Sequence, residues 1–384
     1  MYNFLNEKIT KTILPPSTIG IIGGGQLGRM MAISARQMGY RIAVLEPGTN
    51  SPLGQIADIE LNASYNDVDA LIKLLDIADV VTYEFENVPY AIVRKYASVG
   101  YLPQGHMPLT ITSHRLREKL AIEEAGYKVA PFLAVMSKDE LKVAVKRIGY
   151  PCILKTSSGG YDGKGQWVLR SDDDLPAVLA IANDNEYILE GFVNFTKEIS
   201  VIVTRSTKGE VQVFPVTENV HVNQILHTSI APATIGNTVR AKAEQIAKGL
   251  IQKLDFVGTL AIEMFVTDEG IVINELAPRP HNSGHWTIDG CNISQFEQHI
   301  RAICGLPLIK PEIKGHAVMV NLLGQHTEYA LSAWQQPELS DAKLHLYGKE
   351  EMKRDRKVGH INFVGDDWKA LQVKVVKFLE GMPK

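Results

Sequence analysis

Long hydrophobic runs, paired cysteines and an excess of basic charge are all missing from this sequence of 384 residues. No stretch approaches the roughly 18 continuous apolar residues of a membrane span, and residues 1–17 hold no apolar core like that of a signal peptide. The three cysteines are an odd number without CxxC spacing, which argues against a disulfide framework and a structural zinc site. We therefore expect a cytoplasmic protein without membrane contact.

The charge balance argues against nucleic acid as the main partner. The formal net charge is -3, and no long basic run is present. Binding to a phosphate backbone needs clustered Lys and Arg side chains. Any local cluster of cations should therefore serve a smaller anion.

The length predicts two or three domains, because one hydrophobic core rarely serves so long a chain. Residues 18–48 read as strand, glycine turn, helix and strand, and the apolar segment 79–85 extends this alternation. Residues 1–112 are therefore predicted to form a small parallel-sheet domain. Its strand ends should border a ligand crevice.

The rest of the chain reads as an α+β module. A helical pattern from Ser113 to Gly126, with Leu116 and Leu120 one turn apart, marks its entry. Residues 259–266 and 271–276 are two apolar segments that predict a hairpin. A final helix is predicted after a cap at Asp366. Further strands or helices are predicted at 139–148, 150–155, 166–170, 175–182, 187–193, 198–205, 238–254, 316–324, 343–348 and 360–365.

A glycine turn carries the first candidate site. Gly23, Gly25 and Gly28 satisfy the GxGxxG pattern between a strand and a helix, and Glu46 ends the next strand. This combination is typical of dinucleotide binding. However, any close approach of a ligand to a βα turn favours glycine, and a helix N-terminus binds any anion. The turn is also compatible with one phosphate of a nucleotide substrate.

The segment SSGGYDGKGQ, residues 157–166, indicates polyphosphate binding. Its glycines bracket an acid and a lysine, which gives a backbone able to close over phosphates. It is not a Walker A loop, because Lys164 is followed by Gly165 and a strand rather than by Ser or Thr at a helix start. Lys155 on the preceding strand adds a second cation. The alternative is an ordinary hairpin turn.

Two acids stand inside apolar strands, Glu263 in LAIEMF and Glu275 in VINEL. Burying an ionised carboxylate without a partner is costly, so the pair predicts a cation, and magnesium prefers such oxygen ligands. If the turn is only Thr267 to Gly270, residue 263 opposes 274 and the two acids fall on opposite faces. A longer turn or a β-bulge is therefore required. The alternative is that each acid pairs with a core Arg or points outward.

The loop APRPHNSGH follows the second acid and concentrates Arg279, His281, Asn282 and His285. Pro278 and Pro280 stiffen this loop, and its side chains suit a charged substrate or an oxyanion transition state. A second cluster, YGKEEMKRDRKVGH, is by itself a solvated turn. It becomes a candidate phosphate clamp only if the substrate is anionic. Its cations are Lys349, Lys353, Arg354, Arg356 and Lys357.

These motifs together resemble the N5-carboxyaminoimidazole ribonucleotide synthetases of the ATP-grasp superfamily. The resemblance rests on GGGQLGRM, YEFENV, GGYDGKGQ, NELAPRPHNSGH and YGK…RKVGH and runs from about Thr18 to Phe363. It implies an ATP-grasp fold of mixed α/β and α+β class. The implied domains are a pre-ATP-grasp domain at 1–112, an ATP-grasp domain at 113–309 with a lid at about 150–215, and a C-terminal domain at 310–384.

The resemblance also implies roles for single residues. ATP would be surrounded by Arg115, Lys155, Gly160, Tyr161, Asp162, Gly163, Lys164, Gly165, Gln166, Glu190, Gly191, Phe192, Val193, Glu198, His221, Asn274 and Glu275. Glu190 to Val193 would hold the adenine edge through backbone groups, Glu198 would take the ribose hydroxyls, and Glu263 and Glu275 would hold two magnesium ions. The carboxyphosphate would contact Tyr161, Asp162, Lys164, Arg279, His281 and Asn282. The ribonucleotide would contact Gly25, Gln26, Leu27, Glu84, Asn87, Lys349 and Arg356, where Arg356 is preferred over Arg354 and Lys357 as the phosphate ligand.

The implied reaction is attack of bicarbonate on the γ-phosphate of ATP, followed by transfer of the carboxyl group to the amine of 5-aminoimidazole ribonucleotide. The implied assembly is a homodimer that works with a mutase. Formate-dependent glycinamide ribonucleotide transformylase is the alternative within the superfamily. Outside it, the alternatives are a nicotinamide-dependent oxidoreductase and a catalytically inactive binding module.

Overall fold

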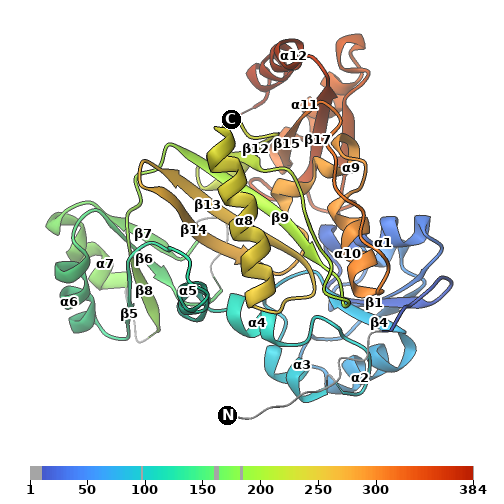
Figure 1. The fold of residues 1–384 in the computed structure, drawn as a ribbon, viewed down its shortest axis with the longest axis horizontal. Helices are drawn as coiled ribbons and strands as arrows, with labels where there is room; N and C mark the ends of the chain where they lie inside the picture. Colours follow the sequence, from blue (N-terminus) through green and yellow to red (C-terminus); the bar gives the residue numbers. More distant parts are fainter. Residues whose placement is uncertain (1–10, 97, 160–163, 182–184, 384) are drawn as a thin grey trace.

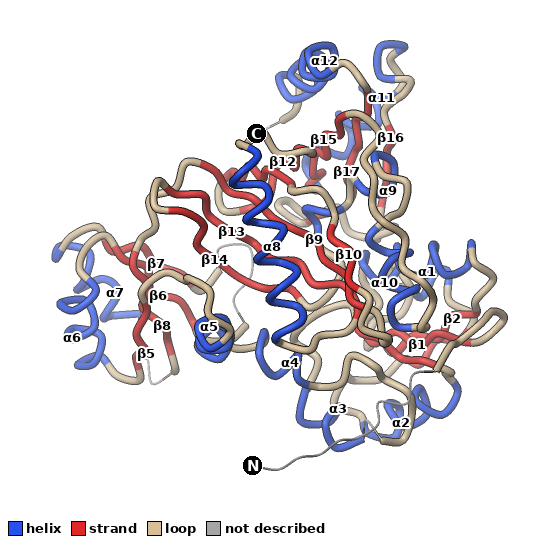
Figure 2. The backbone as a smooth tube through the Cα atoms, in the orientation of Figure 1, coloured by secondary structure: helices blue, strands red, loops and turns tan. Residues whose placement is uncertain are grey.

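The computed structural model describes residues 11–96, 98–159, 164–181 and 185–383 and arranges them around three sheets (Figures 1 and 2). A four-stranded sheet lies near the N-terminus, a second four-stranded sheet lies at the opposite side of the molecule, and a nine-stranded sheet runs between and beyond them. Within these ranges, no helix has the length and apolar character needed to cross a membrane.

The N-terminal sheet is parallel, with the strand order β3-β2-β1-β4. The glycine turn leads directly into α1, which ends before Gly39, and Gly39 has the positive φ of 91° that glycine adopts readily. The predicted βαβ unit is therefore confirmed. The elements of this region are β1 (Thr18–Ile22), α1 (Gln26–Gln37), β2 (Arg41–Leu45), β3 (Ile59–Leu61), α2 (Val68–Ile77), β4 (Val80–Tyr83), α3 (Tyr90–Tyr96) and α4 (Met107–Thr112).

A helix and a small antiparallel sheet follow. The helix is α5 (Arg115–Glu124), and the sheet has the order β5-β8-β6-β7, with α6 and α7 packed on it. The glycine-rich segment joins β6 to β7, as predicted. The elements are β5 (Phe132–Val135), α6 (Lys138–Ile148), β6 (Cys152–Thr156), β7 (Gln166–Leu169), α7 (Leu175–Ile181) and β8 (Tyr187–Gly191).

The large sheet has the order β14-β13-β9-β11-β12-β15-β17-β16, and β10 pairs with β9. Because β12 pairs with β15, one continuous sheet joins the central part of the chain to its C-terminal part. The elements are β9 (Lys197–Arg205), β10 (Val211–Val213), β11 (Thr217–Val222), β12 (Ile225–Ala231), α8 (Asn237–Lys253), β13 (Gly258–Thr267), β14 (Gly270–Ala277), α9 (Thr287–Gly290), α10 (Gln295–Ile303), β15 (His316–Leu323), α11 (Thr327–Trp334), β16 (Lys343–Leu346), β17 (Lys357–Gly365) and α12 (Trp368–Glu380).

Helix α8 covers one face of β9, β13 and β14 (Figure 1). Ile199, Val201 and Val203 of β9 all pack into this core, as their alternation predicts. Ile202, between them, is buried in another cluster on the opposite side, so β9 is covered on both faces. Ile262 and Met264 of β13 also belong to the core under α8. Glu263, which lies between them, therefore points away from α8.

One local prediction is confirmed and another is corrected. The helix predicted from Leu116 and Leu120 is α5, although Leu120 is 45% exposed and the buried face of α5 carries Glu118 and Lys119. The cap of α12 is Asp367 rather than Asp366, because the Asp367 side chain accepts the backbone N–H groups of Lys369 and Ala370. Leu371, Val375 and Phe378 of α12 are buried, with Trp368 packed beside them, as the spacing predicts.

Replacing each aspartate in turn should show which of Asp366 and Asp367 caps α12. Asp367→Ala leaves two N–H groups at the start of α12 without their acceptor and should lower the free energy of unfolding by about 1 kcal/mol. Asp366→Ala is the matched control and should change it little. Urea unfolding of the three proteins measures both effects, and a larger loss in the Asp366 variant would reverse the assignment.

Candidate active site

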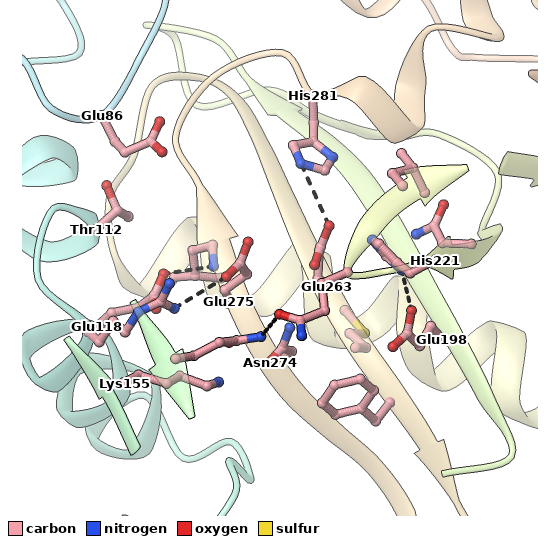
Figure 3. A pocket seen from close by; sticks show the side chains of 18 of the residues that line it. Glu86, Thr112, Glu118, Lys155, Glu198, His221, Glu263, Asn274, Glu275 and His281 are labelled. Carbon is pink, nitrogen blue, oxygen red and sulfur yellow. Dashed lines mark hydrogen bonds and ion pairs between the residues drawn. The ribbon is translucent and has the colours of Figure 1, made fainter. Parts of the chain in front are cut away.

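A cavity of about 620 Å³ lies between the small sheet and strands β9, β13 and β14 of the large sheet. Figure 3 shows Lys155 on one side of this cavity and Glu198, His221, Glu263 and Glu275 on the other. Most of the described residues that the sequence assigned to ATP, magnesium or carboxyphosphate border the same space. They are Arg115, Lys155, Gln166, Phe192, Glu198, His221, Glu263, Asn274, Glu275, Arg279, His281 and Asn282.

The glycine-rich segment is described only in part. Gly160, Tyr161, Asp162 and Gly163 lie outside the described residues. Lys164 and Gly165 form the turn that leads into β7, and the side chain of Lys164 is exposed. On β7, Gln166 donates its side-chain amide to Gln224 in the turn between β11 and β12, at 2.5 Å, so the small sheet contacts the large one across this cavity.

Glu263 and Glu275 face each other across neighbouring strands. The turn between β13 and β14 is short, since Thr267 pairs with Gly270, and Met264 pairs with Ile273. The register then shifts, so Glu263 pairs with Glu275, and Asn274 is the extra residue of a bulge in β14. Directly paired residues share a face of a sheet. The prediction that the two acids lie on one face because of a bulge is confirmed.

The two acids repel each other inside the cavity. Burial, together with the charge of Glu275, raises the pKa of Glu263 to about 7. His281 Nε2 lies 3.6 Å from Glu263 Oε1, and Arg115 Nη1 lies 3.5 Å from Glu275 Oε2 (Figure 3). A cation between the carboxylates would relieve this repulsion.

The donor set fits magnesium held together with a nucleotide. No group of three or more His, Cys, Asp or Glu side chains that could hold a metal occurs in the described ranges. Magnesium does not need one, since one or two carboxylates and the phosphates of a substrate usually suffice. The side-chain amide of Asn282 is also buried at this cavity, and neither its nitrogen nor its oxygen has a hydrogen-bond partner among the described residues. Such an amide indicates a ligand.

Glu190 and Lys155 form a buried ion pair at the small-sheet side. Lys155 Nζ lies 2.8 Å from Glu190 Oε2, and Lys119 Nζ lies 3.5 Å from Glu190 Oε1. Burial opposes the ionisation of Glu190, but the two ammonium groups outweigh it and lower its pKa to about 2.

The backbone N–H groups of Gly191 and Phe192, which follow Glu190, are bonded to the carbonyls of Pro131 and Pro151.

Glu198 of β9 accepts a hydrogen bond from the ring of His221 on β11. Burial lowers the pKa of His221, but this bond and the charge of Glu263 outweigh it, so the pKa is raised.

At the other end of the cavity, Arg279 Nε donates to Glu86 Oε2 at 2.6 Å. Burial opposes the ionisation of Glu86, but Arg279 outweighs it and lowers the pKa of that carboxyl.

Three charged residues of the site escaped the sequence analysis. Glu118 and Lys119 lie on α5 at positions three and four after Arg115, a spacing that places all three on one face. Charged residues on a helix usually indicate a solvent-exposed face. The sequence therefore predicts an exposed face here, whereas Glu118 and Lys119 are buried. Glu86 lies between Glu84 and Asn87, the two residues of YEFENV that the sequence analysis assigned to the ribonucleotide. Its ion-pair partner, Arg279, lies in a loop far along the chain.

A second cavity, of about 480 Å³, borders the glycine turn. It is lined by Gly25, Gln26, Glu84, Lys349 and Arg356, which the sequence assigned to the ribonucleotide, and also by Glu46. Two of the assigned residues lie elsewhere. Leu27 of α1 is buried in the hydrophobic core, and Asn87 lines the first cavity. Of the alternative phosphate ligands, Lys357 lines the first cavity, and Arg354 lines neither.

The helix N-terminus beside the second cavity is already occupied by carboxylates. Glu84 accepts the backbone N–H groups of Gly25 and of Gly28, the latter at 2.7 Å. Glu46 accepts the N–H of Gly24 at 2.7 Å and the hydroxyl of Tyr65 at 2.5 Å. Burial raises the pKa of Glu84, and the two backbone hydrogen bonds work against this rise.

Comparison with known proteins connects all three parts of the chain to one enzyme family. Family models match residues 17–105 as a ribonucleotide synthetase preATP-grasp domain, 120–296 as an ATP-grasp domain and 317–374 as a phosphoribosylaminoimidazole carboxylase C-terminal domain. N5-carboxyaminoimidazole ribonucleotide synthase of Bacillus subtilis is 50% identical over 361 residues, which cover 93% of this chain and 94% of that protein. The chain belongs to the N5-carboxyaminoimidazole ribonucleotide synthase family.

Solved structures agree with this membership. An ADP complex of an N5-carboxyaminoimidazole ribonucleotide synthetase matches with a TM-score of 0.94 and 53% identity, covering 97% of this chain and 98% of that one. An Aspergillus clavatus N5-carboxyaminoimidazole synthase in complex with ADP and 5-aminoimidazole ribonucleotide matches with a TM-score of 0.87 and 29% identity, covering 95% and 98%. The mixed fold with a parallel N-terminal sheet and an ATP-grasp domain is thereby confirmed.

Removing the charge of Glu190 should destabilise the fold in a pH-dependent way. Glu190→Gln leaves Lys155 and Lys119 buried without their anion, which should cost about 3–5 kcal/mol at pH 7. Because the folded-state pKa is lowered, the carboxylate stabilises the fold above about pH 4.5 and loses this contribution as the pH falls towards 2. The difference in the free energy of unfolding between Glu190→Gln and the unmodified protein should therefore be smaller at pH 4 than at pH 7.

Urea unfolding at the two pH values measures this difference. Glu269→Gln, which removes an exposed carboxylate paired with Lys128, is the control and should change little. An equal loss at both pH values for Glu190→Gln would show that the ionised pair is not its source.

Proposed function

We propose that this chain is an ATP-dependent ligase that carboxylates 5-aminoimidazole ribonucleotide with bicarbonate, through carboxyphosphate, to give N5-carboxyaminoimidazole ribonucleotide in purine biosynthesis. The observation that carries the proposal is the paired carboxylates Glu263 and Glu275, aligned by a bulge in a cavity that also holds Lys155 and the Arg279 loop. Relatives named for this reaction, and a related structure holding ADP and the ribonucleotide, support the substrates.

ATP would lie in the first cavity, with its phosphates directed towards Lys155, Arg115 and the segment 160–166. Glu263 and Glu275, with Asn274 beside them, would hold magnesium, which neutralises phosphate charge during phosphoryl transfer. The Glu198–His221 pair would receive the ribose hydroxyls. Since the N–H groups of Gly191 and Phe192 are bonded within the protein, these two residues would offer the adenine edge their carbonyls.

In the first step an oxygen of bicarbonate forms a bond to the γ-phosphorus, the bond to the β-phosphate oxygen breaks, and ADP leaves. Arg279, His281 and Asn282 would hold bicarbonate in line for this attack. Burial, and then Arg279, lower the pKa of His281 well below its ordinary value, so the ring is neutral. Its Nδ1 accepts the backbone N–H of Ser283, which leaves the ring proton on Nε2, towards Glu263 and the cavity. His281 is thus suited to donate a hydrogen bond to a reacting oxyanion.

In the second step the amine nitrogen of the ribonucleotide attacks the carboxyl carbon, inorganic phosphate leaves, and the nitrogen loses a proton. Carboxyphosphate hydrolyses in water, so water must be excluded from the cavity before the second step. Lys164 is proposed to shield the intermediate together with Tyr161 and Asp162, which lie outside the described residues. The homodimer, the cytoplasmic location and the mutase partner stay predictions, as do the domain boundaries.

The second cavity would hold the ribonucleotide. Glu84 and Glu46 place carboxylates on the amides where a dinucleotide would place its pyrophosphate, which disfavours the oxidoreductase alternative. A phosphate would instead be attracted to Lys349 and Arg356, which line the same cavity. This arrangement favours a substrate whose donor groups face the glycine turn and whose phosphate faces the C-terminal turn.

The decisive test of the proposed function is a coupled assay. ATP cleavage should depend on both bicarbonate and the ribonucleotide, and phosphate release should match carboxylated product. Glycinamide ribonucleotide with formate is the control for the alternative within the superfamily. ATP with magnesium should also raise the melting temperature, whereas NAD should not. ATP cleavage indifferent to bicarbonate would contradict the proposal.

Arg356→Ala should weaken binding of the ribonucleotide alone. Losing a charge-assisted hydrogen bond to its phosphate should raise the KM for the ribonucleotide by about tenfold to 100-fold, with the KM for ATP nearly unchanged. Arg354→Ala is the matched control, because it removes a neighbouring cation that lines neither cavity. Steady-state kinetics with each substrate varied measure both constants, and equal effects on the two KM values would reject the assignment.

A further inference from the structure

Helix α5 buries one acidic and one basic side chain against strand β14, and the reaction described above uses neither. Glu118 and Lys119 are 3% and 2% exposed. Burial and the nearby charge of Glu275 raise the pKa of Glu118 to about 8. Burying these groups is costly. The hydrogen bonds that they make to β14 indicate what they do.

Strand β14 is the outermost strand of the large sheet, so one of its edges pairs with no other strand among the described residues. The amide of Ile273 points to this edge and donates to the carbonyl of Lys128 at 2.8 Å. In a regular strand the next amide on the same edge belongs to the second residue along, here Glu275. The amide on this edge is instead that of Leu276. The amides on the outer edge are therefore shifted by one residue. The pairing with β13 shows the same shift and identifies Asn274 as the extra residue.

The backbone groups on either side of Glu275 are bonded to the two buried side chains of α5. Lys119 Nζ donates to the carbonyl of Asn274 at 3.0 Å, and Glu118 Oε1 accepts the amide of Leu276 at 2.7 Å. Without them, a carbonyl and an amide displaced by the bulge would be buried without partners. Slipping the strand by one residue would restore a regular ladder and turn Glu275 to the opposite face.

We propose that Glu118 and Lys119 are positioning residues that hold the bulge of β14 and so keep the Glu275 carboxylate beside Glu263. This inference rests on the proposed function, since it gives the pair of acids their shared role at the metal. Lys119 also contacts Glu190 of β8, the partner of Lys155. The same ammonium group therefore connects the proposed metal ligands in the large sheet to the proposed phosphate ligand in the small sheet.

Two substitutions at Glu118 separate hydrogen bonding from charge. Glu118→Gln keeps an acceptor oxygen for the amide of Leu276, whereas Glu118→Leu removes it. Lys119→Met removes the donor to Asn274 and keeps the apolar stem. Glu124→Leu, which removes an exposed carboxylate from the same helix, is the control.

Two measurements apply to all four variants. The first is hydrogen exchange of the peptide covering β14, in metal-free protein. The second is Mn²⁺ binding to the ADP complex, followed by electron paramagnetic resonance.

Glu118→Leu and Lys119→Met should speed exchange at β14 and weaken Mn²⁺ binding by about tenfold or more, as loss of a residue that orients a metal ligand does. The kcat should fall in parallel, with the KM for the ribonucleotide unchanged. Glu118→Gln and Glu124→Leu should resemble the unmodified protein. If Glu118→Leu does not fold, Lys119→Met decides the question.

Faster exchange with unchanged Mn²⁺ binding would overturn the proposal, as would a Glu118→Gln variant as impaired as Glu118→Leu. Failure of the proposed function itself would be distinct. In that case the unmodified ADP complex would bind no Mn²⁺, while exchange at β14 would still respond to the α5 variants.

Discussion

The active site depends on keeping several carboxylates inside the protein, where an unpaired charge is costly. Most of them are given a fixed partner. Glu190 has two ammonium groups, Glu86 has the guanidinium of Arg279, and Glu84 has the amides of the glycine turn. Glu263 and Glu275 instead face each other, and Arg115 reaches only the latter at 3.5 Å. The imbalance at this one pair would attract a cation brought by the nucleotide.

Rigid support for His281 comes from a helix and a strand that pack against its loop. The loop after β14 is held by Gln295 of α10, whose side chain accepts the N–H of His281 at 2.8 Å and donates to its carbonyl at 2.7 Å. Ser200 of β9 donates to Ser283, which in turn contacts Nδ1 of His281. The imidazole is thus oriented from both the helix and the strand below it. A site held in this way loses little entropy when substrates bind.

Much of the fold and of the site is predictable from local sequence. The βαβ unit, the hairpin of β13 and β14, and the buried stripe of α12 follow from apolar spacing and glycine placement, and Glu263 and Glu275 stand out because acids are rare in such strands. The need for a bulge could be deduced from the turn length. Its position at Asn274 could not, because it is set by contacts with Glu118 and Lys119, some 155 residues away. A charged face on a short helix reads as solvent-exposed until its partners are known.

The two cavities are connected through the loop that follows β14. Arg279 is bound to Glu86, two residues after Glu84, so a single ion pair ties the loop of the first cavity to the strand end that borders the second. A reactive acyl phosphate must meet its amine before water does, which requires that the two substrates be aligned before the first step. If the ribonucleotide binds beside Glu84 as proposed, it lies two residues along the chain from the Glu86–Arg279 pair. This pair would then connect the proposed ribonucleotide site to the groups that are proposed to hold bicarbonate.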